Sequence, residues 1–209
     1  MKALVLCLAL GAVSAFGGSR EAPIRLYTNF QQEPPEAVLD SLQEELSSIM
    51  VPMGLGFEWR ALAGTKGNEV STELAVIHFK GQCDAAGLEP VDGYPGPLGW
   101  THISDGEILP FADINCDGVR IFLQRDLLKV AEKDRSTVYG RALARVLAHE
   151  LYHIFAKTTK HASWGVAKSA YSVQELLSVR FQFEKKECDV LRAHQRWLEA
   201  TSAAADAGQ

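Results

Sequence analysis

The residues best suited to chemistry lie in one short segment, His149-Glu150-Leu151-Tyr152-His153. The segment falls inside an apolar-periodic stretch, 135–158, that predicts a long amphipathic helix. On a helix, residues four apart project from one face, so both imidazoles can reach a single metal ion. Glu150 can then reach a water bound to that ion. The pattern predicts a Zn²⁺ site with His149 and His153 as ligands and Glu150 as general base.

A catalytic zinc also needs a third protein ligand and an open fourth position. His161 follows the expected end of the helix near Thr158, and a chain reversal there would bring it to the metal. Glu175 is the alternative, because a glutamate on a following helix is the third ligand in thermolysin-like sites. The segment Ser172-Val173-Gln174-Glu175 also matches a helix capping box, which would occupy that glutamate. We therefore prefer His161 and keep Glu175 as the alternative.

Two further motifs carry possible chemistry. Tyr171 follows the metal-binding stretch, and we expect its hydroxyl to stabilise the oxyanion of a tetrahedral intermediate. The segment Asp113-Ile114-Asn115-Cys116-Asp117-Gly118 matches the opening of a calcium loop, but its twelfth position is Gln124 instead of glutamate. We interpret that segment as a tight turn before a strand.

The composition is that of an ordinary globular protein, with 209 residues, 47% of them hydrophobic and 22% charged. This length suits a single domain, which we place at 16–200. The formal net charge of −5 argues against binding to nucleic acid or to an anionic membrane surface. We expect a monomer whose partner is a peptide or protein substrate.

Both ends of the chain carry signals of their own. Lys2, the apolar run 3–13 and the small residues up to Ala15 predict a signal peptide, 1–15, that is too short to span a bilayer. The protein is therefore expected to be secreted or periplasmic. The small, polar residues 201–209 predict a flexible tail.

Export implies an oxidising compartment, in which cysteines pair. Cys83 and Cys116 flank the middle of the chain, and we predict a disulfide bond between them. Cys188 lies in a helical pattern and is expected to be a buried thiol.

The remaining hydrophobic patterns predict an α+β fold. A helix opens after Pro34-Pro35 and runs to Met50, and a final helix is expected over 173–198. Asp105-Gly106 predicts a turn. The strands are expected at 24–30, 55–62, 74–79, 100–104 and 119–123.

The motif at 149–153 followed by His161 resembles the zincin superfamily of metallopeptidases, and the order of elements from residue 24 onward is similar to that of metzincins. The resemblance implies a mixed, mostly parallel twisted sheet with a backing helix and an active-site helix, followed by a small helical C-terminal lobe. It also implies that the edge strand 100–104 lines the cleft and pairs with extended substrate, with Gly99 near the cleft.

The chain departs from the metzincin pattern at three points. Ala156 stands where metzincins have glycine, the third histidine lies eight residues after His153 instead of six, and no methionine follows the motif. The expected function is that of a secreted zinc-dependent endopeptidase. An exported, catalytically inactive, zinc-stabilised binding module is the alternative, and hydrolysis of a non-peptide amide is not separated from peptide hydrolysis by the sequence.

Overall fold

A computed structural model describes residues 24–67, 71, 73–89, 93 and 96–207. Five strands form one sheet in the order β2-β1-β3-β5-β4. All neighbouring strands pair in parallel except β4, which is antiparallel to β5. The expected mixed, mostly parallel sheet is therefore confirmed. The strands are β1 (Ile24–Gln32), β2 (Phe57–Ala61), β3 (Leu74–Gln82), β4 (Gly99–Ser104) and β5 (Glu107–Asn115).

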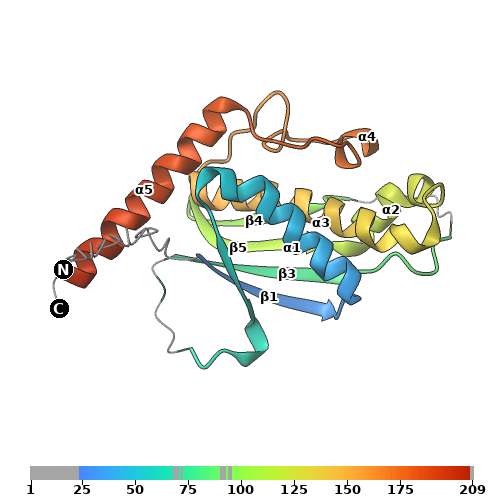
Figure 1. Ribbon diagram of the computed structural model, residues 1–209, viewed down its shortest axis with the longest axis horizontal. Helices are drawn as coiled ribbons and strands as arrows, with labels where there is room; N and C mark the ends of the chain where they lie inside the picture. Colours follow the sequence, from blue (N-terminus) through green and yellow to red (C-terminus); the bar gives the residue numbers. More distant parts are fainter. Residues whose placement is uncertain (1–23, 68–70, 72, 90–92, 94–95, 208–209) are drawn as a thin grey trace, which may run out of the picture.

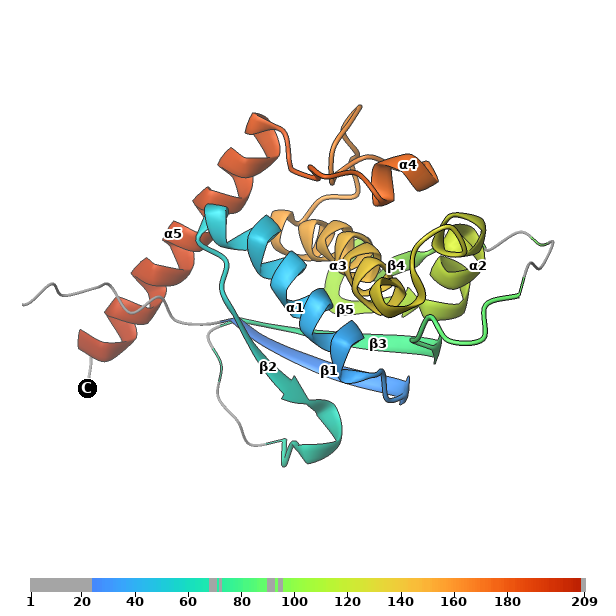
Figure 2. The same ribbon diagram turned by 45° about the vertical axis from the view of Figure 1, so that its right-hand side comes forward.

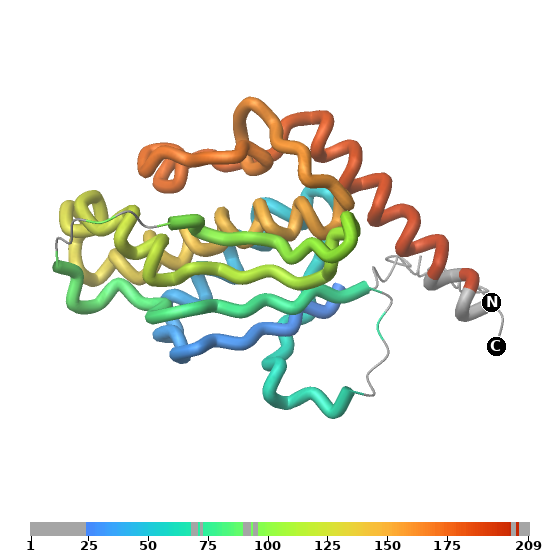
Figure 3. The backbone as a smooth tube through the Cα atoms, turned by 180° about the vertical axis from the view of Figure 1, so that it is seen from behind, coloured from blue at the N-terminus to red at the C-terminus, as the bar shows by residue number. Residues whose placement is uncertain are grey.

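Two helices, α1 (Glu36–Met50) and α3 (Glu132–Ala156), pack side by side against one face of this sheet (Figures 1 and 2). Figure 3 shows the other face, which no helix of the described residues covers. The core lies between the sheet and the two helices, because apolar side chains alternate along β3 and recur every fourth residue along α3. Leu143, Leu147 and Leu151 of α3 are fully buried. This packing fixes which face of α3 is left for the site.

The edge of the sheet beside α3 is a β-hairpin. Asp105 and Gly106 form its two-residue turn, with φ of +52° and +83°, as their sequence predicted. Strand β5 was not predicted from the sequence, because Pro110 interrupts its hydrophobic pattern. The pairing register shifts between Thr101 and Ile103, so that Pro110 lies opposite an irregular part of β4, where proline is tolerated in a sheet.

The predicted strand 119–123 is wrong, because these residues belong to helix α2 (Cys116–Leu127). The Asn115 side chain accepts a 2.8 Å hydrogen bond from the Gly118 amide and so caps the helix. The apparent calcium loop is thus a helix start. The β-branched residues within 119–123 are typical of a strand. However, the buried residues of α2 include Val119, Leu123 and Leu127, which recur at helical spacing.

The predicted single helix 173–198 is also wrong. The chain forms one short helix, α4 (Val173–Leu176), then an extended stretch, then α5 (Lys185–Ala207). Phe181 and Phe183 are both buried and alternate with exposed neighbours, which is the period of an extended chain. Helix α5 continues to Ala207, so most of the segment predicted as a tail is helical.

The predicted disulfide bond between Cys83 and Cys116 is confirmed, and it ties the end of β3 to the start of α2. Cys188 is a free, half-buried thiol. Among the described residues, no helix is both long and apolar enough to cross a membrane. The predicted signal peptide lies outside the described residues, and the boundaries 16–200 remain a prediction.

Candidate metal centre

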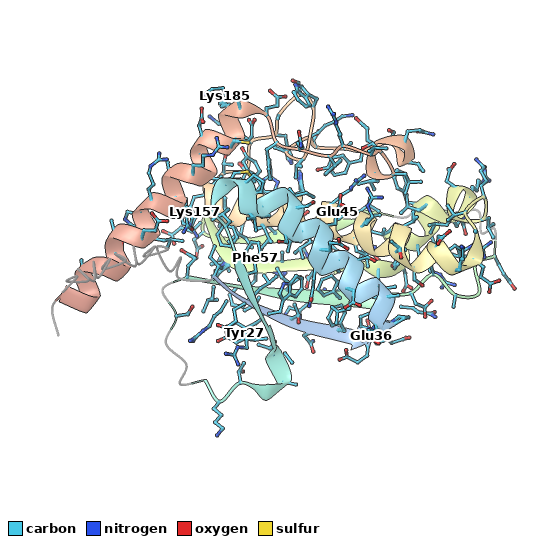
Figure 4. All side chains as sticks on the ribbon, in the orientation of Figure 1. Tyr27, Glu36, Glu45, Phe57, Lys157 and Lys185 are labelled. Carbon is cyan, nitrogen blue, oxygen red and sulfur yellow. A yellow bond between two sulfur atoms is a disulfide. The ribbon has the colours of Figure 1, made fainter. Side chains whose placement is uncertain are left out.

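His149 and His153 lie one turn apart on α3, each 8% exposed, with their Nε2 atoms 3.0 Å apart. The helix ends at Ala156, and Lys157 adopts a left-handed conformation with φ of +46°, which turns the chain back (Figure 4). The return brings in His161, so that one ring nitrogen from each histidine lies within 4.8 Å of the others. The structure thus assembles the three histidines that the sequence analysis preferred.

Two backbone carbonyls orient the helical histidines. His149 Nδ1 lies 2.8 Å from Val166 O, and His153 Nδ1 lies 2.6 Å from Thr158 O. Because a carbonyl oxygen only accepts, each Nδ1 must carry the proton, which leaves two Nε2 lone pairs facing each other. Two such acceptors at 3.0 Å repel unless a cation lies between them.

This donor set fits zinc. Zn–N bonds of about 2.0–2.1 Å in a tetrahedral site place ligand nitrogens about 3.4 Å apart, close to the spacing of the two helical histidines. Burial lowers the pKa of His149 to about 4 and also lowers the pKa of His153. Both rings are therefore neutral at neutral pH, which is the state that binds metal.

Glu150 lies next to the first histidine and is 4% exposed. Thr101 of β4 donates a 2.7 Å hydrogen bond to its Oε2 atom. Burial raises the pKa of Glu150 to about 7, against the smaller opposing effect of this hydrogen bond. A carboxylate with a pKa near neutrality is matched to taking up and releasing a proton at physiological pH.

Two cavities meet at Glu150. The smaller, about 260 Å³, extends toward His161 along Trp100 and Ile103 of β4. The larger, about 350 Å³, is lined in part by the apolar side chains of Leu98, Phe122 and Val146. Gly99 and Ser169, with His149 and Glu150, line both. Both cavities thus open onto Glu150 beside the edge strand.

Gly99 permits this arrangement. A Cβ atom at this position would lie 2.9 Å from Glu150 Oε1 and 3.0 Å from a methyl group of Val146. The backbone of β4 therefore approaches α3 more closely than any other residue would allow. The expectation that Gly99 lies near the cleft is confirmed.

Tyr171 lies behind His149. Its hydroxyl is 2.9 Å from His149 Nδ1 and donates a hydrogen bond to Val166 O. Nδ1 is on the opposite side of the ring from Nε2, so the hydroxyl holds the imidazole instead of pointing at the three-histidine cluster. The expected role of Tyr171 at an oxyanion remains a prediction, and this position gives it no support.

The side chain of Glu175, the alternative third ligand, contacts other residues instead of the histidines. It forms the predicted capping box with Ser172, and Lys168 Nζ lies 2.6 Å from its Oε1. The bond to Lys168, followed by the bonds to Ser172, lowers the pKa of Glu175 to about 2. The structure does not bring Glu175 to the histidines.

The apparent calcium ligands do not converge either. Asp113 accepts hydrogen bonds from Lys80 and His102, each 2.9 Å long, and Asn115 caps α2. Within the part of the chain that the structure describes, the three histidines are the one group of three or more potential ligands that gather at a point.

The hydrogen-bond partners of these site residues were not predicted from the sequence. Val166 and Thr158 act through backbone carbonyls, which have no side-chain signal. Thr101 belongs to a strand that was predicted, but its role depends on which face of β4 meets α3. Its alternation with the outward-facing Trp100 and His102 is the one signal that could have indicated it.

The chain matches no protein-family profile and no curated protein sequence. Its structure is similar to a crystal structure of archaemetzincin from Methanopyrus kandleri, with a TM-score of 0.45 and 14% sequence identity. The match covers 85% of this chain and 98% of that one. A similarity this low carries no argument about function, which must rest on the residues of the site.

Proposed function

We propose that the protein is a zinc-dependent peptidase. The observation that carries this proposal is the three-histidine cluster with the buried Glu150 carboxylate beside it, at the junction of two cavities. When bound, zinc would supply a Lewis acid and an acidified water. His149, His153 and His161 would hold it.

In this proposal Glu150 carries the proton. Its carboxylate takes a proton from the attacking water and later releases it to the leaving amine. Thr101 keeps the carboxylate in one orientation, and burial raises its pKa to about 7. The two cavities that Glu150 lines would give a substrate room beside this carboxylate.

The edge strand β4 is the proposed docking site for the polypeptide. It pairs with β5 on one side, and among the described strands it has no partner on the other. Trp100, Thr101 and Ile103 of this strand line the smaller cavity. An extended peptide can add to such an edge through main-chain hydrogen bonds, which supports an endopeptidase acting on polypeptides.

An inactive zinc-stabilised module is less well supported. A purely structural zinc site is closed by four protein ligands, whereas three converge here among the described residues. A structural site also has no use for a buried carboxylate beside the ligands. We further propose that the chain is exported and acts as a monomer; the disulfide bond and the leader-like N-terminal sequence support export.

The test is proteolysis of an unfolded protein substrate by the zinc-loaded chain and by Glu150→Gln. We expect the variant to bind zinc and to cleave roughly 10²–10⁴-fold more slowly, the usual contribution of a general base. Glu44→Gln, an exposed residue of α1, is the matched control and should cleave at the wild-type rate. Undiminished cleavage by Glu150→Gln would rule out the mechanism.

A further inference from the structure

One turn before His149, helix α3 carries Arg145, the largest fully buried side chain of the described residues, 1% exposed. A buried guanidinium is costly unless its charge and its N–H groups are matched. Its Nε donates a 2.7 Å hydrogen bond to Glu45 Oε1 on α1, the helix that lies beside α3 (Figure 4). This pair supplies the counter-charge.

The other end of the same guanidinium reaches the chain that follows the metal centre. Nη1 donates a 2.7 Å hydrogen bond to Leu176 O and lies 3.4 Å from Glu175 O, at the end of α4. The guanidinium carbon lies 5.0 Å from the centre of the Phe181 ring. One side chain thus joins α1, α3 and the segment 173–183.

That segment contacts both residues that hold His149, Val166 and Tyr171. The Phe181 ring packs edge-on against Tyr171, with ring centres 5.3 Å apart, and the Tyr171 hydroxyl contacts His149. The Val166 amide donates a 3.1 Å hydrogen bond to Gln182 O. The Val166 carbonyl, which accepts from His149 Nδ1, is therefore tied to the backbone one residue beyond Phe181.

We propose that Arg145 is a positioning residue of the metal centre, which holds segment 173–183 against α3 so that Val166 and Tyr171 keep His149 in its ligand orientation. This inference rests on the proposed zinc site. It depends on the planar fork of arginine, which bonds Glu45 and Leu176 at once. A lysine ammonium has no such fork and cannot make both contacts in the same geometry.

A role of Arg145 in folding alone can be distinguished from a role in positioning the metal centre. Buried ion pairs add little net stability, and Arg145 Nη2 has no hydrogen-bond partner in the described part of the chain. Replacing both members of the pair by apolar residues of similar size should therefore leave the zinc-free protein folded. Under our proposal the same replacement still weakens zinc binding.

The chain offers a matched control in Arg141. It lies one turn earlier on α3, and its Nε is 3.2 Å from Oε2 of the same Glu45. It makes no hydrogen bond to segment 173–183 among the described residues. A change at Arg141 disturbs the Glu45 carboxylate but leaves the contacts with Leu176 and Phe181 in place.

The experiment compares Arg145→Lys, the double variant Glu45→Met/Arg145→Met and the control Arg141→Met. Zinc affinity is measured by competition with a chelator, and amide hydrogen exchange at Val166 is measured in the zinc-free proteins. We expect zinc affinity to fall roughly 10- to 100-fold in both Arg145 variants, the range found when partners of metal ligands are removed. Exchange at Val166 should accelerate at least about tenfold, and Arg141→Met should change neither quantity.

Wild-type zinc affinity and wild-type exchange at Val166 in Arg145→Lys would overturn the proposal. Equal losses in Arg145→Lys and Arg141→Met would also overturn it, because they would assign the effect to Glu45 alone. If the double variant does not fold, the lysine variant decides. If the wild-type protein binds no zinc, the proposed function fails, and the exchange at Val166 still shows whether Arg145 holds the segment.

Discussion

Thr101 on β4 and Glu150 on α3 are joined by a 2.7 Å hydrogen bond from the threonine hydroxyl to the carboxylate. The two residues lie 49 positions apart in the sequence, on the edge strand and on the helix that carries His149 and His153. The strand proposed to bind substrate therefore also orients the proposed base. A change in β4 should therefore alter the orientation of the Glu150 carboxylate even when the three histidines are unchanged.

The first prediction concerns this bond. In Thr101→Val the carboxylate loses a charge-assisted hydrogen bond, worth about 1.5–3 kcal/mol, so kcat should fall roughly 10- to 100-fold. Zinc affinity should stay within about twofold, because no metal ligand is touched. Steady-state proteolysis and chelator competition measure the two quantities. Thr101→Ser restores the hydroxyl and should recover most of kcat; a valine variant with full kcat would disprove the role of Thr101.

A second prediction uses the close approach at Gly99. The added methyl group of Gly99→Ala would meet Glu150 Oε1 at 2.9 Å, so the carboxylate must move. Core overpacking of this kind typically costs about 1–3 kcal/mol, and cleavage should fall at least about tenfold.

Gly64→Ala is the control for that variant, because nothing lies within 4 Å of a Cβ atom at Gly64. Proteolysis rates and denaturant unfolding of both variants make the comparison. Equal activity of the two alanine variants would show that Glu150 tolerates the added methyl group.

The sequence predicted the parts of this molecule that depend on local pattern. The apolar repeat of α3 and the four-residue spacing of His149 and His153 fix both the helix and the shared face. Asp105-Gly106 dictates its turn, and the motif Ser172 to Glu175 dictates its capping box. The approach of His161 to the two helical histidines was also predicted, because β-branched residues at the helix end indicated where the chain would turn back.

The errors have tertiary causes. Pro110 argued against a strand at β5, because a proline is tolerated in this strand only where the pairing with β4 is irregular. Segment 177–184 was read as helix, yet Phe181 and Phe183 are buried by packing, and Arg145 binds the carbonyls at the end of α4. Contacts between residues about 30 positions apart leave no periodic signal in the sequence.

A third prediction is the pH dependence of stability in the zinc-free protein. The pKa of Glu150 is raised from 4.5 to about 7 on folding. The folded state therefore binds this proton more tightly than the unfolded chain. The resulting stabilisation is complete below the unfolded pKa and is lost as the pH rises through about 7.

The glutamine in Glu150→Gln does not titrate. The free energy of unfolding of this variant minus that of the wild type should therefore increase by about 3 kcal/mol between about pH 4 and pH 8. His149, whose pKa is lowered to about 4, acts in the opposite direction, since its contribution is lost as the pH falls. Taking the difference between the two proteins cancels the His149 effect. Urea unfolding at several pH values gives this difference, and parallel curves would contradict a raised pKa.

A fourth prediction concerns the disulfide bond between Cys83 and Cys116, which closes a loop with a sequence separation of 33. Replacing both cysteines by alanine should cost about 2–4 kcal/mol in the free energy of unfolding, mainly by releasing the unfolded chain. Cys188→Ala is the control and should cost less. Equal unfolding free energies for the double variant and the wild type would show that the bridge does not constrain the chain.

The central claim is that His149, His153 and His161 hold one zinc ion. Its most direct test is the zinc content of the purified wild type, His161→Ala and Glu175→Ala after dialysis against a weak chelator. The account predicts one zinc per chain in the wild type and in Glu175→Ala, and a large loss in His161→Ala. Zinc retained by His161→Ala and lost by Glu175→Ala would contradict it.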